Sequence, residues 1–102
     1  MTELEKIDLE LFKVCYPNTN RVRIPRTFSF VDPVYGIINC FSVLIPEMNR
    51  RGWYYTVSYD PSFQCHEAMF WNEDAQDFKA TDDNNVAEAV SKAAYAALKG
   101  EK

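Results

Sequence analysis

The segment 53–71, WYYTVSYDPSFQCHEAMFW, decides the fold that we predict for this chain. Aromatic and β-branched residues alternate on both sides of an Asp-Pro-Ser turn, and a period of two is typical of extended strands. Pro61 fixes its own φ angle, and the aspartate before it can accept hydrogen bonds from the backbone of the turn. The segment therefore predicts a β-hairpin. The better-buried face of its first strand should carry Trp53, Tyr55, Val57 and Tyr59.

Helices are predicted on both sides of this hairpin. Thr2 and Glu5 have the spacing of a capping box, in which each side chain bonds the backbone N–H of the other residue. Apolar residues follow at helical spacing, so we expect a helix over 3–15. Later in the chain, the polar residues 81–85 offer helix caps, and Lys99-Gly100 should end the helix that follows. One side of that helix carries a stripe of mostly small residues: Val86, Val90, Ala93, Ala94 and Ala97.

A third helix is predicted before the hairpin. Asp32 and Pro33 form a favourable start, because Asp accepts a hydrogen bond at the N-cap and Pro lacks only an N–H that needs no partner there. Pro46 would remove a hydrogen bond inside the helix, so we expect a break before it and a turn over 46–51. Gly52 should then adopt a left-handed conformation. The predicted apolar face consists of Ile37, Ile38, Phe41, Leu44, Ile45 and Met48.

The remaining segments complete a single α+β domain that spans all 102 residues. Residues 76–80 are long enough for a third strand beside the hairpin. Residues 21–30 alternate in the manner of a strand, but Pro25 would confine such a strand to a sheet edge. The predicted fold is a small antiparallel sheet of two or three strands, packed with N-terminal, middle and C-terminal helices. The alanine stripe of residues 86–97 and the 37–48 helix should cover one face of the hairpin.

The composition restricts the classes of partner. Asp and Glu number 15 against 11 Lys and Arg, and the net charge of −4 argues against generic binding to nucleic acid or to an anionic membrane. No apolar run approaches the ~20 residues that span a bilayer. The three cysteines are odd in number and lack ligand spacing, which argues against a disulfide framework or a structural zinc ion and predicts a reducing cytoplasm.

No arrangement of residues points to catalysis. His66 is the only histidine, and strand alternation directs it away from its neighbours Cys65 and Glu67. Cys15 or Cys40 could approach His66 in the fold, but a nucleophilic cysteine also needs a lowered pKa and a positioned base. The chain has no Gly-rich phosphate loop. We therefore predict a protein that is not an enzyme and has neither a cofactor nor a metal site.

Four motifs follow one another in order: PEMNRRGW at 46–53, WYYTVSY at 53–59, CHEAMFW at 65–71 and KATDDNNVAEAVSKAAYAAL at 79–98. Through them the region 32–98 resembles the phage ABA-sandwich domain, a family of small and mostly uncharacterised phage and prophage proteins. The resemblance implies helices that flank a sheet and a phage or prophage origin. It implies no catalytic residue. Residues 18–30 depart from the family pattern.

A run of carboxylates follows the hairpin and is the first candidate surface. Carboxylates on a rigid scaffold can occupy the positions of phosphates and so block a nucleic-acid-binding protein. The alternative is a solvated loop that continues into helix caps, and the spacing does not fit an EF-hand. The run consists of Glu73, Asp74, Asp77, Asp82 and Asp83, opposed only by Lys79.

A second candidate surface is basic and aromatic. Arginines beside aromatic rings can hold single-stranded nucleic acid or a nucleotide, although the same charges also keep an exposed sheet edge from pairing. Side chains on one face of the hairpin would add to a partner- or ligand-binding site if that face is exposed. The residues in question are Arg21, Arg23, Arg26, Tyr54, His66 and Phe70.

Size, acidity and the resemblance lead to one functional prediction. We expect a non-enzymatic phage or prophage accessory protein, in the cytoplasm of an infected or lysogenic bacterium. It would bind and inhibit a host protein of a defence system, in the manner of an anti-CRISPR. The alternatives are a module that binds a nucleotide or another small ligand, and a nucleic-acid-binding protein, which the net charge disfavours.

Overall fold

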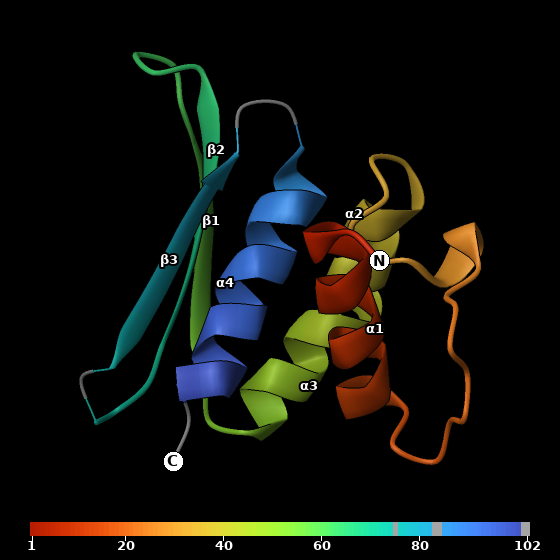
Figure 1. Ribbon diagram of the computed structural model, residues 1–102. Helices are drawn as coiled ribbons and strands as arrows, with labels where there is room; N and C mark the ends of the chain where they lie inside the picture. The colour runs from red at the N-terminus through yellow and green to blue at the C-terminus, as the bar shows by residue number, and fades with distance from the viewer. Residues whose placement is uncertain (75, 83–84, 101–102) are drawn as a thin grey trace.

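The computed structural model describes residues 1–74, 76–82 and 85–100, and it has the predicted α+β class (Figure 1). A three-stranded antiparallel sheet in the order β1-β2-β3 forms one layer. Helix α4 lies against this sheet, and the other helices lie behind α4 (Figure 1). In chain order the elements are α1 Glu3–Cys15, η1 Arg26–Phe28, α2 Tyr35–Asn39, η2 Cys40–Leu44, α3 Ile45–Arg50, β1 Tyr54–Asp60, β2 Cys65–Trp71, β3 Asp77–Asp82 and α4 Val86–Gly100.

The first helix follows from its capping box, as predicted. Thr2 Oγ1 accepts a hydrogen bond from the Glu5 N–H at 3.1 Å, and Glu5 Oε1 accepts one from the Thr2 N–H at 3.3 Å. The helix then buries Ile7, Leu11 and Phe12 in the core. The capping box provides acceptors for free N–H groups of the first turn, and the buried apolar face holds the helix against the domain.

The predicted break before Pro46 is wrong, because α2, η2 and α3 follow one another without a gap from Tyr35 to Arg50. The turn η2 is π-helical, and the Ile45 N–H donates to the Cys40 carbonyl five residues earlier. A proline inside a regular helix clashes with the preceding turn. The wider π-helical turn before Pro46 relieves that clash. After Arg50 the chain turns at Gly52, whose φ of +92° confirms the predicted left-handed residue.

The predicted apolar face of this middle helix is only half right. Leu44, Ile45 and Met48 are buried, together with Cys40. In contrast, Ile37, Ile38 and Phe41 are 42%, 65% and 43% exposed. Contact with α4 decides which side is buried: a Cβ added to Gly36 would lie 2.8 Å from the Ala87 Cβ. The π-helical turn also shifts the helical phase, so side chains on either side of it no longer share one face.

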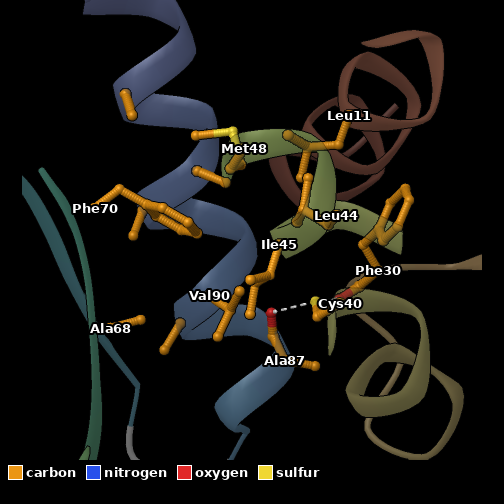
Figure 2. Packing of buried hydrophobic residues seen from close by; sticks show 14 of the residues in the cluster. Leu11, Phe30, Cys40, Leu44, Ile45, Met48, Ala68, Phe70, Ala87 and Val90 are labelled. Atoms are coloured by element: carbon orange, nitrogen blue, oxygen red, sulfur yellow. Dashed lines mark hydrogen bonds between the residues drawn. The ribbon is translucent and has the colours of Figure 1, made fainter. Parts of the chain in front are cut away.

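The strand considered for residues 21–30 is absent, and Arg26–Phe28 forms a short 3-10 helix instead. The chain then crosses the core at Phe30, whose backbone bonds to side chains and not to a strand. The Phe30 N–H donates to Asp8 Oδ1 at 2.8 Å, and its carbonyl accepts from Ser91 Oγ at 2.8 Å and from Cys40 Sγ at 3.2 Å. Figure 2 shows Phe30 and Cys40 side by side between the helices.

The hairpin has the predicted form. Asp60 Oδ1 accepts from the Ser62 N–H at 2.9 Å in its turn, and β1 pairs with β2 so that Tyr54 lies opposite Trp71. The predicted third strand is present as β3. Ala68 and Phe70 of β2 point toward α4, as Figure 2 shows. Both residues are 1% exposed.

The first strand is less well covered than we predicted. Trp53 is buried, but Tyr55 and Tyr59 are 39% and 53% exposed although they share the helix-covered face. Helix α4 packs on β2 and β3, and only α3 has several contacts with β1. The tip of the hairpin also projects past the helices (Figure 1). The edge strand β1 therefore has an aromatic face with incomplete cover.

The Phe30 carbonyl provides a test of this packing. Replacing Ser91 by alanine removes a buried donor and should lower the free energy of unfolding by about 1–3 kcal/mol, because the carbonyl keeps only the weak thiol donor. Ser42→Ala is a matched control, since the Ser42 hydroxyl also donates to a backbone carbonyl but is exposed to water. It should change stability by no more than about 0.5 kcal/mol. Urea unfolding of both variants measures the difference, and equal effects would contradict the role assigned to Ser91.

The buried carboxylate at the other end of this segment predicts a pH dependence. Burial raises the pKa of Asp8 above its ordinary 3.8, although Ser29 and Phe30 donate hydrogen bonds to it; the charge of Asp32 raises it further. The pKa of Asp8 is thus higher in the folded protein than in the unfolded chain. The protonated carboxyl therefore contributes stability that is fully present below pH 3.8 and is lost as the pH rises through the folded pKa. Asp8→Asn removes this titration.

The stability of the native protein relative to Asp8→Asn should therefore fall as the pH rises from about 3 to about 7. Urea unfolding of both proteins at a series of pH values measures this difference. Comparing the two proteins at each pH cancels the opposite contribution of Asp32, whose pKa is lowered by its hydrogen bonds to Tyr35 and Arg26. A difference that rises with pH would contradict the raised pKa of Asp8.

Candidate partner-binding surface

One face of the sheet carries no helix. Every described helix lies on the other side of the sheet (Figure 1). Because opposite residues in an antiparallel pair share a face, the register places Tyr54, Met69 and Trp71 together on the helix-free side. On the same side, Lys79 of β3 forms an ion pair with Glu67 of β2 at 3.3 Å. Apart from Met69, the side chains named on this face are charged or aromatic.

An aromatic pair, of which Tyr54 is exposed and Trp71 is half-buried, lies at one end of this face, beside part of the acidic run. The rings of Tyr54 and Trp71 are 5.8 Å apart, and Tyr54 is 48% exposed. The Tyr54 hydroxyl donates to Glu73 Oε1 at 3.1 Å, and this hydrogen bond raises the pKa of Tyr54. Asp74 and Asp77 are exposed next to Glu73 in the chain. We call Tyr54, Trp71, Glu73, Asp74 and Asp77 the aromatic–acidic corner.

Two hollows flank Tyr54, and both are lined by Gly52, Trp53 and Tyr54. One of about 700 Å³ extends toward Arg51 and the turn between β2 and β3, and one of about 400 Å³ extends toward Asn49, Tyr55 and Trp71. The side chain of Asn72 forms hydrogen bonds within the turn between β2 and β3. Asn72 Oδ1 accepts from the N–H groups of Asp74 and Gln76 at 3.1 Å each. The corner is thus preorganised, which lowers the entropic cost of binding.

The structure divides the predicted acidic run. Glu73, Asp74 and Asp77 belong to the corner, and none of the three forms an ion pair with a described residue. Asp82 lies at the far end of β3, roughly 16 Å away along the strand. It faces Lys92 of α4 at 3.5 Å. Asp83 lies outside the described residues.

The predicted basic and aromatic residues do not form one site. Arg26 donates to Asp32 Oδ1 at 2.7 Å, and its guanidinium lies 5.3 Å from the ring of Tyr35. Arg23 lines a hollow of about 450 Å³ beside Glu5. Arg21 lies in the preceding loop, where its N–H bonds Thr19 Oγ1. The three arginines therefore have separate surroundings.

The predicted hairpin residues lie on two different faces. Tyr54 is on the helix-free face, whereas His66 and Phe70 are on the covered one. Phe70 is 1% exposed and belongs to the core, so it cannot contact a partner. The ring of His66 lies 5.1 Å from that of Tyr59. Of these three predicted residues, only Tyr54 takes part in the aromatic–acidic corner.

The sequence predicted Trp71, like Tyr54 and Tyr59, as an interface anchor if exposed, and it missed Asn72 and Gln76. A turn over 60–65 forces residues 54 and 71 to face each other across the hairpin. No signal marked Asn72 or Gln76, since any polar turn residue could occupy their positions. Their role comes from hydrogen bonds that only the folded turn forms.

Cys15 and Cys40 lack the lowered pKa of a nucleophilic cysteine. Burial raises the pKa of Cys15 to about 12 and that of Cys40 to about 12, so both are protonated at neutral pH. Within the described part of the chain, no group of three or more His, Cys, Asp and Glu side chains could hold a metal ion. None of the described helices is long and apolar enough to cross a membrane.

Comparison with protein families, with curated proteins and with solved structures finds no match to this chain. The resemblance to the phage ABA-sandwich domain therefore stays a prediction. The arguments for function depend on the geometry of the surface.

The raised pKa values of Cys15 and Cys40 predict slow alkylation. A rise from 9.0 to about 12 lowers the thiolate fraction at about pH 8 by a factor of about 1,000. Iodoacetamide should therefore label both residues far more slowly in the folded protein than in urea, as peptide mass spectrometry can measure. If either labels at the rate of the unfolded chain, its thiol is reactive and a catalytic role returns for consideration.

Proposed function

We propose that this protein is a non-enzymatic accessory protein of a phage or prophage, and that it binds a host protein and inhibits it. The contact surface is the aromatic–acidic corner. The observation that supports this proposal is a group of three carboxylates that form no ion pair with a described residue and lie beside an exposed tyrosine, at one end of a sheet face that no described helix covers.

The corner fits a basic protein surface. Carboxylates that form no ion pair with a described residue are available to arginine and lysine side chains, and charge-assisted hydrogen bonds are among the strongest in proteins. Tyr54 and Trp71 supply rigid aromatic area, and such residues dominate binding hot spots. The net charge of −4 would also accelerate association with a positively charged partner. The favoured partner is therefore a nucleic-acid-binding protein, whose phosphate-binding site is basic.

Inhibition would follow from occupancy. A carboxylate held on a strand can occupy the position of a phosphate, so the partner could not bind this protein and its nucleic acid together. A host defence complex that binds nucleic acid is the partner that this mechanism suits, as for an anti-CRISPR. Phage origin and defence inhibition come from the resemblance and remain parts of the proposal.

Small-ligand binding has less support. The arginines considered for it have separate surroundings, as described above. The cation beside the larger hollow, Arg51, donates to Glu47 Oε2 at 3.0 Å and so already has an acidic partner. A nucleotide would meet mainly carboxylates and amides there, which repel or bind phosphate poorly.

The proposal predicts that the carboxylates of the corner determine affinity. Asp74→Asn/Asp77→Asn should weaken binding to the host partner at least about tenfold, which corresponds to about 1.4 kcal/mol. The immobilised native protein would first be used to isolate the partner from host lysate. The purified partner would then be titrated by calorimetry, and its own nucleic acid should compete with this protein for binding.

Glu3→Gln/Glu10→Gln is the matched control, because it removes two exposed carboxylates from α1, away from the sheet. This variant should bind within about twofold of the native protein, and the difference between the two variants should shrink in high salt. Equal loss in both variants, unchanged binding by the corner variant, or simultaneous binding of nucleic acid would each disprove the proposal.

A further inference from the structure

The two edges of the sheet differ in how they are protected against pairing. β3 carries Asp77, Lys79 and Asp82, and α4 packs against it. β1 has the sequence YYTVSYD, without proline or lysine, and its only charge is Asp60 at the end. No described segment pairs with the outer edge of β1. Natural proteins normally block an exposed edge with charges, proline or a bulge, and β1 lacks such protection along six of its seven residues.

The sequence of β1 is complementary to itself in an antiparallel register centred on Val57. In that register Tyr55 lies opposite Tyr59 of a second copy, and Thr56 lies opposite Ser58. Aromatic pairs and hydroxyl pairs directly across two strands each contribute roughly 0.2–1 kcal/mol. Asp60 would lie opposite Tyr54, so no like charges face each other across the two strands. In this register, neither face of the new strand pair brings together side chains that repel each other.

An exposed apolar patch lies beside this edge. Phe41 of η2 contacts Tyr55 edge to face, with ring centroids 6.5 Å apart. Ile37 and Ile38 precede Phe41 by one helical turn, and all three are at least 42% exposed. Apolar groups gathered in this way usually mark an interaction surface. We call Ile37, Ile38, Phe41, Tyr55 and Tyr59 the edge patch.

We propose that two copies of this chain form a symmetric dimer by pairing their β1 edges about Val57. A two-fold axis perpendicular to the sheet relates the copies and joins them into one six-stranded sheet with all helices on one side. Tyr59 is the second-last residue of β1, close to the turn of the hairpin, where its own chain gives incomplete cover. In the dimer it packs against Tyr55 of the second copy, and the second copy's Phe41 lies next to that ring.

The dimer interface includes Tyr54 but none of the carboxylates of the proposed contact surface. Glu73, Asp74 and Asp77 lie in β3 or in the turn before it, on the opposite side of β2 from β1. The three carboxylates of the aromatic–acidic corner would therefore stay exposed in each copy, whereas Tyr54 of the corner would lie opposite Asp60 of the second copy. A dimer would present two corners and could bind two partner molecules or two sites of one complex.

Charge substitutions on the exposed residues of β1 test both the dimer and its register. Sedimentation velocity at about 50 µM should give the native protein a mass twice 11.8 kDa. Thr56→Lys/Ser58→Lys places lysine opposite lysine twice, as Thr56→Glu/Ser58→Glu does with glutamate, so each variant alone should raise the dimer Kd at least tenfold. An equimolar mixture should form heterodimers, because each lysine then faces a glutamate. Recovery in the mixture also shows that both variants are folded.

Asn20→Lys/Thr81→Lys is the matched control, since it adds the same two charges at exposed positions away from the β1 edge. It should remain a dimer, and so should Asp74→Asn/Asp77→Asn. A monomeric native protein would overturn the proposal, as would a dimer that Thr56→Lys/Ser58→Lys leaves intact. Loss of the dimer in the control variant, or no recovery in the mixture, would overturn the β1 register.

Discussion

The fold depends on satisfying the backbone of Phe30 inside the core. A buried N–H or C=O without a partner costs free energy comparable to a lost hydrogen bond, and no strand lies beside Phe30 to supply one. The partners are Asp8 from α1, Cys40 from η2 and Ser91 from α4. Three elements far apart in the sequence must therefore meet at one residue. Neighbouring carbonyls are held similarly, since Asn39 donates to the Ser29 carbonyl and Asn85 to that of Val31, at 2.9 and 2.8 Å.

This arrangement places α4 between the sheet and the remaining helices, and both surfaces discussed above follow from it. The alanine stripe of α4 lets the helix lie close to β2 and β3, and one helix cannot also cover β1. The aromatic residues of β1 are only partly covered by the middle helix. Together with exposed apolar residues of that helix, they form the edge patch. The other face of the sheet receives no helix and carries the aromatic–acidic corner. The position of α4 on β2 and β3 thus leaves two separate surfaces, one suited to a second copy and one suited to a basic partner.

Local signals predicted the candidate site only in part. The acidic run was visible in the sequence, but Asp82 belongs to an ion pair with α4, because β3 separates it from the turn that holds Glu73 and Asp74. Tyr54 was recognised as a potential contact residue, whereas Phe70 was assigned to the same face by mistake. Strand alternation could have separated them, since residue 54 faces 71 and not 70 across the hairpin. The exposure of Ile37 and Phe41 had no local signal, because it depends on where α4 and the π-helical turn place the middle helix.

The amino-acid sequence by itself determined the elements whose hydrogen bonds are local: the capped helix α1, the hairpin with its Asp60 turn, the left-handed Gly52 and the helix α4. In each case the residues that specify the structure lie within a few positions of the groups that they bond. Only the tertiary structure decided the course of residues 21–31, the continuation of the helix through Pro46 and the side of the middle helix that is buried. These features depend on contacts such as that between Phe30 and Ser91, 61 residues apart in the chain. No local pattern encodes such contacts, because their free energy exists only once the helices have packed.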